Sequence, residues 1–392
     1  MDYLEGKKRR KLKIEEVIIV GAGMAGLGCA RQLNDNGKKF KIITDDIGGR
    51  VRTSPDGEVN YGAYYLTADC KNILPYTRIT GKIKFSNSHL HNGRDHYHLF
   101  SLRALKHGPA FLRLLKDLYI FRKHVNKNRK YATEHSRKKL IESDPLLKKY
   151  YHEKAAKYIK ERKLEKIVDE YVEQFLWASF FYDCRKVSTA LFLGSLLPLI
   201  TQGYSFKMLF YKIMKGFKDD IIKDSVIKVN RKKNVFELIT SSGRIYKCRK
   251  LVLATPMIVT NKLIKPQKIN GSINVSYYHI NGEIKKPYDV KGYNFFALKD
   301  AAAISKEIDG TYLYFYSGKD NIKKYFKSWE VITHSKWEQC LYFLGDNYVN
   351  CNPEPNLFLA NDHNTPGMED AFINGKYAAK LVLESSQESL NE

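Results

Sequence analysis

Three features are scarce or absent in the sequence. It has too few acidic residues to balance its lysines and arginines, its cysteines are not paired, and it does not open with an apolar leader. Its 392 residues hold 67 lysines and arginines but 42 acids, a net charge of +25. The six cysteines form no C-x-x-C pair, which argues against a disulfide framework or a zinc site and is typical of reduced thiols. The opening MDYLEGKKRRKLKIEE has no signal-peptide core. We expect a cytoplasmic protein without a metal, with a basic tail over residues 1–13.

Long hydrophobic runs are also scarce. The one uncharged stretch of membrane-spanning length is Val187–Phe206, with 20 residues. Gly194, Pro198, Gln202 and Gly203 interrupt it. The sequence therefore predicts a buried helix that kinks or ends near Pro198, followed by a loop. With 43% hydrophobic and 13% aromatic residues, the chain is expected to be globular, with two or more folding units.

A glycine-rich turn follows the first apolar run. Val17–Val20 is β-branched and predicts a strand buried on both faces. Gly21, Gly23 and Gly26 follow at G-x-G-x-x-G spacing, and then come a helix over Ala25–Leu33 and a second strand over Phe40–Ile43. In this context the glycines permit the turn, the approach of a pyrophosphate and helix–strand packing. The pattern predicts a dinucleotide site, with an ordinary βα turn as the alternative.

The middle of the chain is basic and helical. Residues 102–186 hold 22 lysines and arginines against 11 acids, a net +11. Basic amphipathic helices suit an anionic membrane surface, and solvated helix faces are an equally weighted alternative. Specific binding of nucleic acid is not expected, because no recognition motif accompanies the charge. Before this segment, residues 82–99 predict a hairpin that turns at Asn92-Gly93, with four histidines on an exposed face.

Strands return in the second half of the chain. They are predicted at Ser225–Val229, Val235–Thr240, Ile245–Cys248 and Leu251–Ala254, and in a strand-rich block over residues 272–317. Within that block Tyr312, Tyr314 and Tyr316 alternate with Leu313 and Phe315. The tyrosines would share one face, either as an aromatic wall over a flat ligand or as a sheet face packed against helices.

Three further motifs carry a family resemblance. Ile47-Gly48-Gly49-Arg50-Val51-Arg52 follows the second strand, Gly62-Ala63 comes soon after, and NLFLANDHNTPGMEDAFINGKYAAKLV covers residues 356–382. With the glycine turn and the LVLATP strand, they resemble the FAD signatures of the flavin amine oxidase, protoporphyrinogen oxidase and phytoene desaturase superfamily. The resemblance implies an α/β fold: a Rossmann-like FAD/NAD(P)-binding domain from residues 14–100, 220–262 and 353–392, and a discontinuous substrate domain of antiparallel sheet plus helices from 101–219 and 263–352.

The resemblance also assigns roles in holding FAD. The glycine turn would hold the pyrophosphate, and Thr44 or Asp45 would bind the ribose. Val226 would hold the adenine through its backbone, and Arg50 would contact a phosphate or the flavin end. Asp362 would accept a hydrogen bond from the ribityl chain or the phosphate side. Gly367 and Met368 would open a helix toward the pyrimidine edge, where negative charge develops on reduction. The full set is Gly21, Gly23, Met24, Ala25, Gly26, Thr44, Asp45, Gly48, Gly49, Arg50, Gly62, Ala63, Val226, Asp362, Gly367 and Met368.

The sequence departs from the family pattern in three places. The usual glutamate on the ribose is replaced by Thr44 or Asp45, A-G-D reads Ala360-Asn361-Asp362, and no counterpart of the amine oxidase lysine near flavin N5 is found. Cys351 lies too close to the final strand to match a flavinylated cysteine, so FAD should be noncovalent. We expect an FAD-dependent oxidoreductase acting on an apolar or polycyclic substrate, without a named catalytic residue. The alternatives are an amine oxidase and a non-redox use of FAD.

Overall fold

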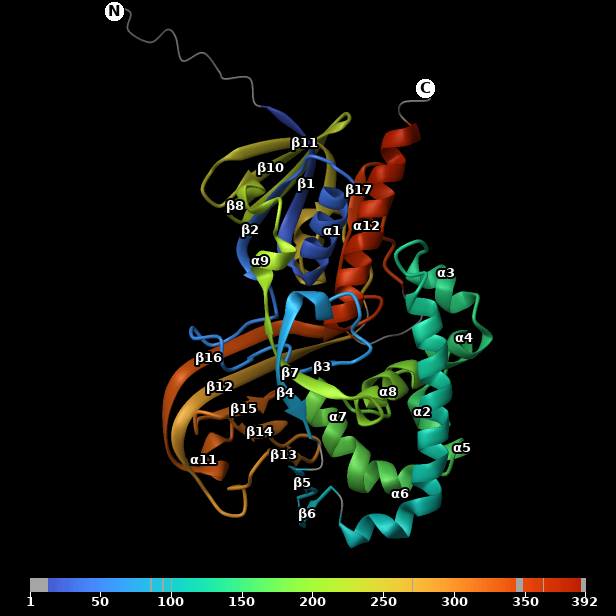
Figure 1. Cartoon of the computed structure of the whole chain (residues 1–392), viewed down its shortest axis with the longest axis vertical. Helices are drawn as coiled ribbons and strands as arrows, with labels where there is room; N and C mark the ends of the chain where they lie inside the picture. Colours follow the sequence, from blue (N-terminus) through green and yellow to red (C-terminus); the bar gives the residue numbers. More distant parts are fainter. Residues whose placement is uncertain are drawn as a thin grey trace, which may run out of the picture.

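The computed structural model describes residues 13–84, 87–93, 95–99, 101–269, 271–342, 348–361 and 363–388. Residues 1–12 of the expected tail and the expected cofactor ligand Asp362 lie outside these ranges. Figure 1 shows three regions: one sheet with α1 and α12, a second curved sheet, and a helical region beside it.

The first sheet is mainly parallel. Its strands run in the order β8-β2-β1-β11-β10-β9, with β17 also paired to β11. β1, β2, β8, β11 and β17 pair in parallel, whereas β9 and β10 form an antiparallel extension. The bounds are β1 Ile14–Gly23, β2 Lys41–Gly48, β8 Ile221–Lys223, β9 Val226–Lys232, β10 Val235–Thr240, β11 Ile245–Leu253 and β17 Leu357–Leu359. Segments far apart in the chain thus build one Rossmann-like sheet, as expected.

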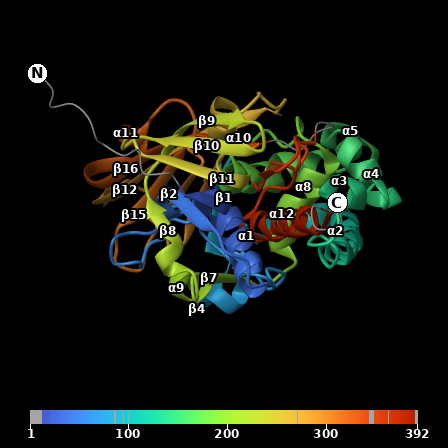
Figure 2. The ribbon, with the colours of Figure 1, turned by 90° about the horizontal axis from the view of Figure 1, so that it is seen from above.

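Burial explains why the first sheet forms at this place. Val17, Ile18, Ile19 and Val20 are at most 4% exposed, as expected for a β-branched strand in the middle of a parallel sheet. α1 (Met24–Asp35) and α12 (Met368–Glu388) pack side by side on one face of the sheet (Figures 1 and 2). On the other face lies a second apolar cluster that includes α10 (Met257–Leu263).

The second sheet is mostly antiparallel, in the order β16-β12-β15-β14-β13-β5-β6. Its strands are β5 Ser88–His91, β6 His96–His98, β12 Ser272–Ile284, β13 Tyr293–Phe296, β14 Ala303–Lys306, β15 Tyr312–Tyr316 and β16 Phe326–Tyr342, with α11 Ile322–Tyr325 between the last two. The hairpin β5–β6 is confirmed, but it joins this sheet through β13, whereas residues up to 100 were expected with the nucleotide domain. The reason is that Leu90 is fully buried in the core of the helical region.

The expectation of an exposed histidine face on the β5–β6 hairpin is wrong for His91. His91 is 7% exposed, stacks on Phe296 at 4.8 Å and shares a 2.8 Å hydrogen bond with the Asn294 side chain. The tyrosine alternation in β15 is confirmed. Tyr314 is fully buried against Tyr325, so this face is a packed core and not a wall over a ligand.

The helical region occupies most of the +11 segment, as predicted. Its elements are η3 Leu102–His107, α2 Gly108–Arg129, α3 Arg137–Glu142, α4 Pro145–His152, α5 Ala155–Glu161, α6 Glu165–Ile167, the π-helical turn η4 Val168–Val172, α7 Glu173–Phe180, α8 Thr189–Leu196 and η5 Leu197–Leu199. The helix α8 ends just before Pro198, as predicted, and is buried. Among the described residues, no helix combines the length and apolar character needed to cross a membrane.

A small three-stranded sheet, β3-β7-β4, lies between these regions. It consists of β3 Leu66–Thr67, β4 Thr77–Ile83 and β7 Gly203–Met208, and the short elements η1 Leu74–Tyr76, α9 Phe210–Ile213 and η6 Lys218–Asp220 adjoin it in the chain. β7 connects the helical region back to the first sheet. Phe206 on β7 and Leu66 on β3 enter the same apolar cluster as α1 and α12.

Candidate functional site

The glycine turn after β1 has the geometry that a dinucleotide turn needs. Gly21 adopts a φ of +98°, and a Cβ there would lie 2.8 Å from the carbonyl oxygen of Ala254. Both facts require glycine at this position. A Cβ at Gly26 would overlap the carbonyl oxygen of Gly21, so only glycine lets α1 enter this close to the strand. The first and third glycines are therefore fixed by the fold itself.

Gly23 is different, because nothing in the fold fills the space beside it. A Cβ at Gly23 would meet no described neighbour closer than the Cα of Gly49, at 4.0 Å. Gly23 is the N-cap of α1, no side chain caps that helix, and its first turn, which begins with Met24 and Ala25, holds no acid. An open space before uncapped helix N–H groups suits a phosphate. The residues present therefore fit the pyrophosphate of FAD.

The end of β2 lies directly against this turn. The Thr44 hydroxyl accepts a 3.2 Å hydrogen bond from the Ala22 N–H, and Thr44 is 6% exposed. The neighbouring Asp45 is exposed and forms no ion pair with a described residue. Its carboxylate is thus available to a ribose, as the resemblance implies for Thr44 or Asp45. The Asp224 N–H donates a 2.9 Å hydrogen bond to the Thr44 carbonyl oxygen. Val226, at the start of β9, therefore lies near the carboxyl end of β2.

The second glycine motif faces the first one. Gly48 pairs with Gly23 in the β1–β2 register, and a Cβ at Gly49 would lie 3.2 Å from the Cα of Gly23. A Cβ at Gly48 would approach the ring of Phe210 to 2.6 Å. Sequence reasoning missed Phe210, because nothing in the residues around it links α9 to a motif more than a hundred positions earlier. The two glycine motifs thus meet at one place, with an aromatic ring beside them.

Arg50 connects the nucleotide region to the second sheet. Its guanidinium donates a hydrogen bond to the carbonyl oxygen of Cys340 on β16. A Cβ at Gly62 would overlap the Arg50 carbonyl and come within 3.2 Å of the Trp337 ring, so the Gly62-Ala63 segment lies against Arg50 and β16. Whether Arg50 also meets a phosphate or the flavin end stays a prediction.

The start of α12 is held by two buried carboxylates that the sequence did not single out. Glu369 accepts hydrogen bonds of 2.8–3.2 Å from the backbone N–H groups of Asn72 and Ile73 and from the Asn72 side chain, and burial raises the pKa of its carboxyl group. Asp370 pairs with Arg129 of α2 at 2.6 Å. These contacts fix the helix that begins at Met368, after Gly367 with its φ of +128°.

α12 reaches the glycine turn through a close helix crossing. A Cβ at Gly375 would overlap the carbonyl oxygen of Ala25, and one at Gly28 would overlap that of Phe372. Both helices run down the same face of the first sheet (Figure 1). Their N-termini therefore point toward the same end of the first sheet.

A small cavity adjoins the first turns of α12. It measures about 20 Å³ and is lined by residues that include Asn361, Asn364, Asp370 and Asn374, which leaves room for about one water molecule. The space beside Gly23 and this cavity are thus separate features. This cavity is too small for a ligand of flavin size.

An aromatic cluster lies where the second sheet meets the Gly62-Ala63 segment. Tyr277 stacks on Tyr61 and packs against Trp337, with 5.1 Å between ring centroids in each pair. Beside it, the Glu307 carboxyl group accepts from Ser305 at 2.7 Å and from Tyr64 at 3.1 Å. Burial raises the pKa of Glu307 and of Tyr64. Tyr312, Tyr314 and Tyr316 of β15 line the opposite face of the sheet from this cluster.

Comparison with known proteins agrees with this architecture. The NAD(P)-binding Rossmann-like domain family matches residues 19–76. Putrescine oxidase bound to putrescine is 12% identical, with a TM-score of 0.67, and the alignment covers 95% of this chain and 99% of that one. Cyclohexylamine oxidase from Brevibacterium oxydans IH-35A is 13% identical, with a TM-score of 0.66 and coverages of 96% and 100%.

A provisionally named protoporphyrinogen oxidase from Exiguobacterium sp. 255-15 is also 13% identical, with a TM-score of 0.61 and coverages of 95% and 100%. A search of curated protein sequences finds no match. At these identities the likeness concerns the fold, over nearly the whole length of each chain. The protein therefore has the amine oxidase/protoporphyrinogen oxidase fold, and residues 19–76 form part of its Rossmann-like region.

Proposed function

We propose that this chain is an FAD-dependent oxidoreductase that removes a hydride from an apolar or polycyclic organic substrate. The observation that carries the proposal is the open space beside Gly23 before the uncapped start of α1, which α12 crosses closely at Gly375. Bound FAD would supply the hydride acceptor. The chain would supply the site: N–H groups of α1 for the pyrophosphate, Thr44 or Asp45 for the ribose, and the start of α12 near the pyrimidine edge.

Noncovalent binding is supported by the state of the cysteines. Cys351 is 8% exposed, and burial raises the pKa of its thiol to about 12. A thiol of this kind stays protonated at neutral pH and is a poor nucleophile. Cys351 is therefore unsuited to forming a bond to the flavin.

The aromatic cluster supports an apolar substrate. Trp337 is the half-buried ring of this cluster, and it lies beside the Gly62-Ala63 segment on top of the buried Tyr277 and Tyr61. The carboxyl group next to this cluster belongs to Glu307. Burial raises its pKa, and its oxygen already accepts hydrogen bonds from Ser305 and Tyr64. The aromatic surroundings favour a flat, apolar substrate.

An amine substrate is the second candidate. It is favoured by the likeness of the fold to putrescine oxidase and cyclohexylamine oxidase. Aromatic rings can also hold an ammonium group by cation–π attraction. Against this candidate stands the missing counterpart of the amine oxidase lysine.

Anaerobic reduction of the purified, FAD-loaded protein tests the proposal. Neutral polycyclic and alkene compounds are mixed with it in one series, and primary and secondary amines in another, while the flavin band at about 450 nm is followed. Bleaching by neutral compounds is the expected result, and bleaching by amines alone would favour the second candidate. Bleaching by dithionite but by no organic compound would indicate a non-redox use of FAD and contradict both.

Trp337→Ala provides the matched variant for the substrate site. It should slow bleaching by the organic substrate, because a ring beside the Gly62-Ala63 segment is lost, and leave bleaching by dithionite unchanged. Trp329→Ala, on the same strand but packed in a different cluster, is the control. Equal rates for the two variants would place the substrate away from Trp337.

A further inference from the structure

The segment formed by η3 and α2 exposes large apolar side chains. Leu102 is 84% exposed, Leu105 74% and Leu112 69%, and Tyr119, two turns further along the helix, is 58% exposed. Exposed leucines are ordinary when they are single, but several together on one face indicate a surface that is covered in use. Figure 2 shows α2 at the rim of the helical region. The inner side of α2 already packs the core through Leu114, Leu118 and Phe121.

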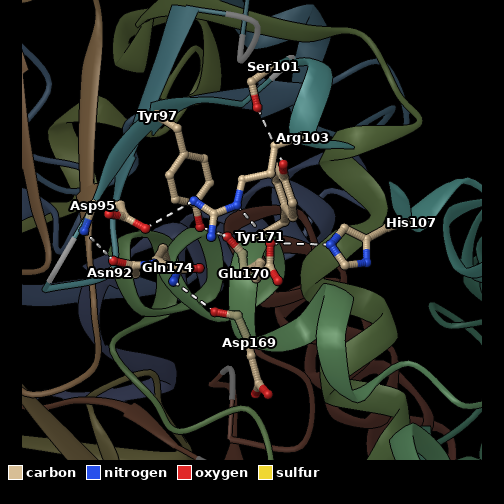
Figure 3. Close-up of polar contacts among 10 residues, drawn as sticks. All are labelled: Asn92, Asp95, Tyr97, Ser101, Arg103, His107, Asp169, Glu170, Tyr171 and Gln174. Atoms are coloured by element: carbon tan, nitrogen blue, oxygen red, sulfur yellow. Dashed lines mark hydrogen bonds and ion pairs between the residues drawn. The ribbon is translucent and has the colours of Figure 1, made fainter. Parts of the chain in front are cut away.

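A polar network holds η3 in this orientation. Arg103, which lies between the two most exposed leucines, turns inward and bonds Glu170 at 3.2 Å and Asp95 at 3.1 Å (Figure 3). Its guanidinium also lies over the Tyr97 ring, 4.8 Å from the centroid. His107 makes a further 3.2 Å contact to Glu170. Arg103 is thus occupied by Glu170 and Asp95, and the leucines on either side of it are the more exposed side chains.

The arginines of α2 also turn inward. Arg113 donates to the carbonyl groups of Arg162 and Lys163, and Arg122 and Arg129 pair with Asp69 and Asp370. The lysines, in contrast, face solvent. Exposed lysines that form no ion pair with a described residue are Lys106, Lys116, Lys123, Lys127 and Lys130.

No acid offsets these lysines along the segment. The single acid between residues 102 and 130 is Asp117. It is 8% exposed and pairs with Arg162 at 2.7 Å, so it is turned away from solvent. The outer surface of η3 and α2 is therefore apolar at its start and cationic along its length.

We propose that this surface docks on an anionic lipid bilayer. We call it the leucine–lysine face and define it by Leu102, Leu105, Leu112, Lys116, Tyr119, Lys123 and Lys127. The leucines would enter the boundary between headgroups and acyl chains, and the lysines would meet the anionic headgroups, which is how interfacial helices bind. The docking depends on no property of the cofactor site, so it can hold or fail separately from the proposed function.

Charge and apolarity together favour a bilayer over other partners. A second copy of the chain would bring its own unpaired lysines against the same face, and like charges repel. A nucleic acid would use the lysines but would leave the exposed leucines in water, because contacts to phosphates need no apolar surface. A bilayer with anionic headgroups satisfies both kinds of residue at once.

Vesicle flotation with the full chain tests the proposal. One set of vesicles is phosphatidylcholine alone, and the other contains about 30% phosphatidylserine. The protein should float with the anionic set and only weakly with the neutral set. Binding should fall as salt is raised from about 0.1 M to about 1 M, because the screening length shortens from about 10 Å to about 3 Å.

Two triple variants separate the apolar and the cationic contributions. Leu102→Ser, Leu105→Ser and Leu112→Ser together should weaken binding by on the order of tenfold for each leucine that enters the bilayer. Lys116→Gln, Lys123→Gln and Lys127→Gln together should weaken it by about fivefold for each lysine. All six side chains are exposed, so the far-ultraviolet circular dichroism and the urea midpoint should stay unchanged in both variants.

Matched controls replace equally exposed residues elsewhere. The apolar control is Ile227→Ser, Ile308→Ser and Ile332→Ser, at side chains that are 59%, 105% and 49% exposed. The cationic control is Lys39→Gln, Lys228→Gln and Lys262→Gln. Both should bind anionic vesicles like the wild type.

Several results would overturn the proposal. The proposal is wrong if the protein binds both vesicle sets equally or binds neither. It is also wrong if the control variants lose as much binding to anionic vesicles as the variants of the leucine–lysine face. A wild-type dimer in analytical ultracentrifugation that the leucine variant abolishes would assign the face to a second copy. Tighter binding to duplex DNA than to anionic vesicles, unaffected by the leucine variant, would assign it to nucleic acid.

Discussion

The crossing of α1 and α12 leaves no room for a side chain at Gly375. A Cβ there would overlap the carbonyl oxygen of Ala25 and lie 2.8 Å from the amide nitrogen of Cys29. Both neighbours are backbone atoms, so no rotamer change can relieve the overlap and one helix must shift. Overpacking of this kind costs about 1–3 kcal/mol, and more where backbone moves. Alanine returns up to about 1 kcal/mol through its helix propensity.

We therefore expect Gly375→Ala to lower the free energy of unfolding by about 1–2 kcal/mol, measured by urea titration. The matched control is Gly194→Ala, inside α8, where a Cβ would meet only the Phe121 ring at an ordinary 3.8 Å. This control should be neutral or stabilising by up to about 1 kcal/mol. Equal or greater stability of Gly375→Ala than of the wild type would refute the close crossing, and with it the placement of both helix N-termini at one end of the first sheet.

Two other predictions concern buried ionisable side chains. Burial lowers the pKa of His91 to about 4, so between about pH 6.5 and pH 4 the unfolded chain binds a proton that the folded chain does not. The free energy of unfolding should therefore fall by up to about 3 kcal/mol as the pH drops through this window. His91→Gln should remove that part of the pH dependence when unfolding is measured by urea titration. An unchanged dependence of the unfolding free energy on pH would show that His91 is not the group responsible. Arg129→Met should cost about 3–5 kcal/mol, because it leaves the buried Asp370 carboxylate unpaired. The double variant with Asp370→Asn should recover most of that loss, and a single variant as stable as the wild type would show that the pair is not needed.

The parts of the fold that were predicted correctly depend on local patterns. The β-branched run at Val17–Val20, the glycine spacing after it and the break at Pro198 each lie within a few residues, and each matches the observed element. One strand was divided wrongly. Separate strands were predicted at Ile245–Cys248 and Leu251–Ala254, but β11 runs on through Arg249 and Lys250, and the buried Lys250 ammonium donates to the carbonyl oxygen of Val382 near the end of α12.

The parts that could not be predicted depend on distant partners. His91 is buried because Asn294 and Phe296 meet it from about two hundred residues away. The need for glycine at Gly375 likewise comes from Ala25, at the other end of the chain. The residues next to His91 and Gly375 in the sequence contain no pattern that indicates these distant partners. For the candidate site, the glycine motifs could be found from the sequence, whereas Phe210 and the carboxylate contacts at the start of α12 could not.

The flavin content of Gly23→Val tests the central claim most directly. The wild type, purified and reconstituted with FAD, should bind one equivalent and show the flavin band at about 450 nm. A Cβ at Gly23 would lie no closer than 4.0 Å to the nearest described atom, the Cα of Gly49, so we expect the variant to keep the wild-type urea midpoint. It should nevertheless be colourless, because the valine side chain would occupy the space in which we propose that the pyrophosphate binds. Gly81→Val, another substitution with open space around it, should stay yellow. A folded Gly23→Val protein with a full equivalent of FAD would contradict the account.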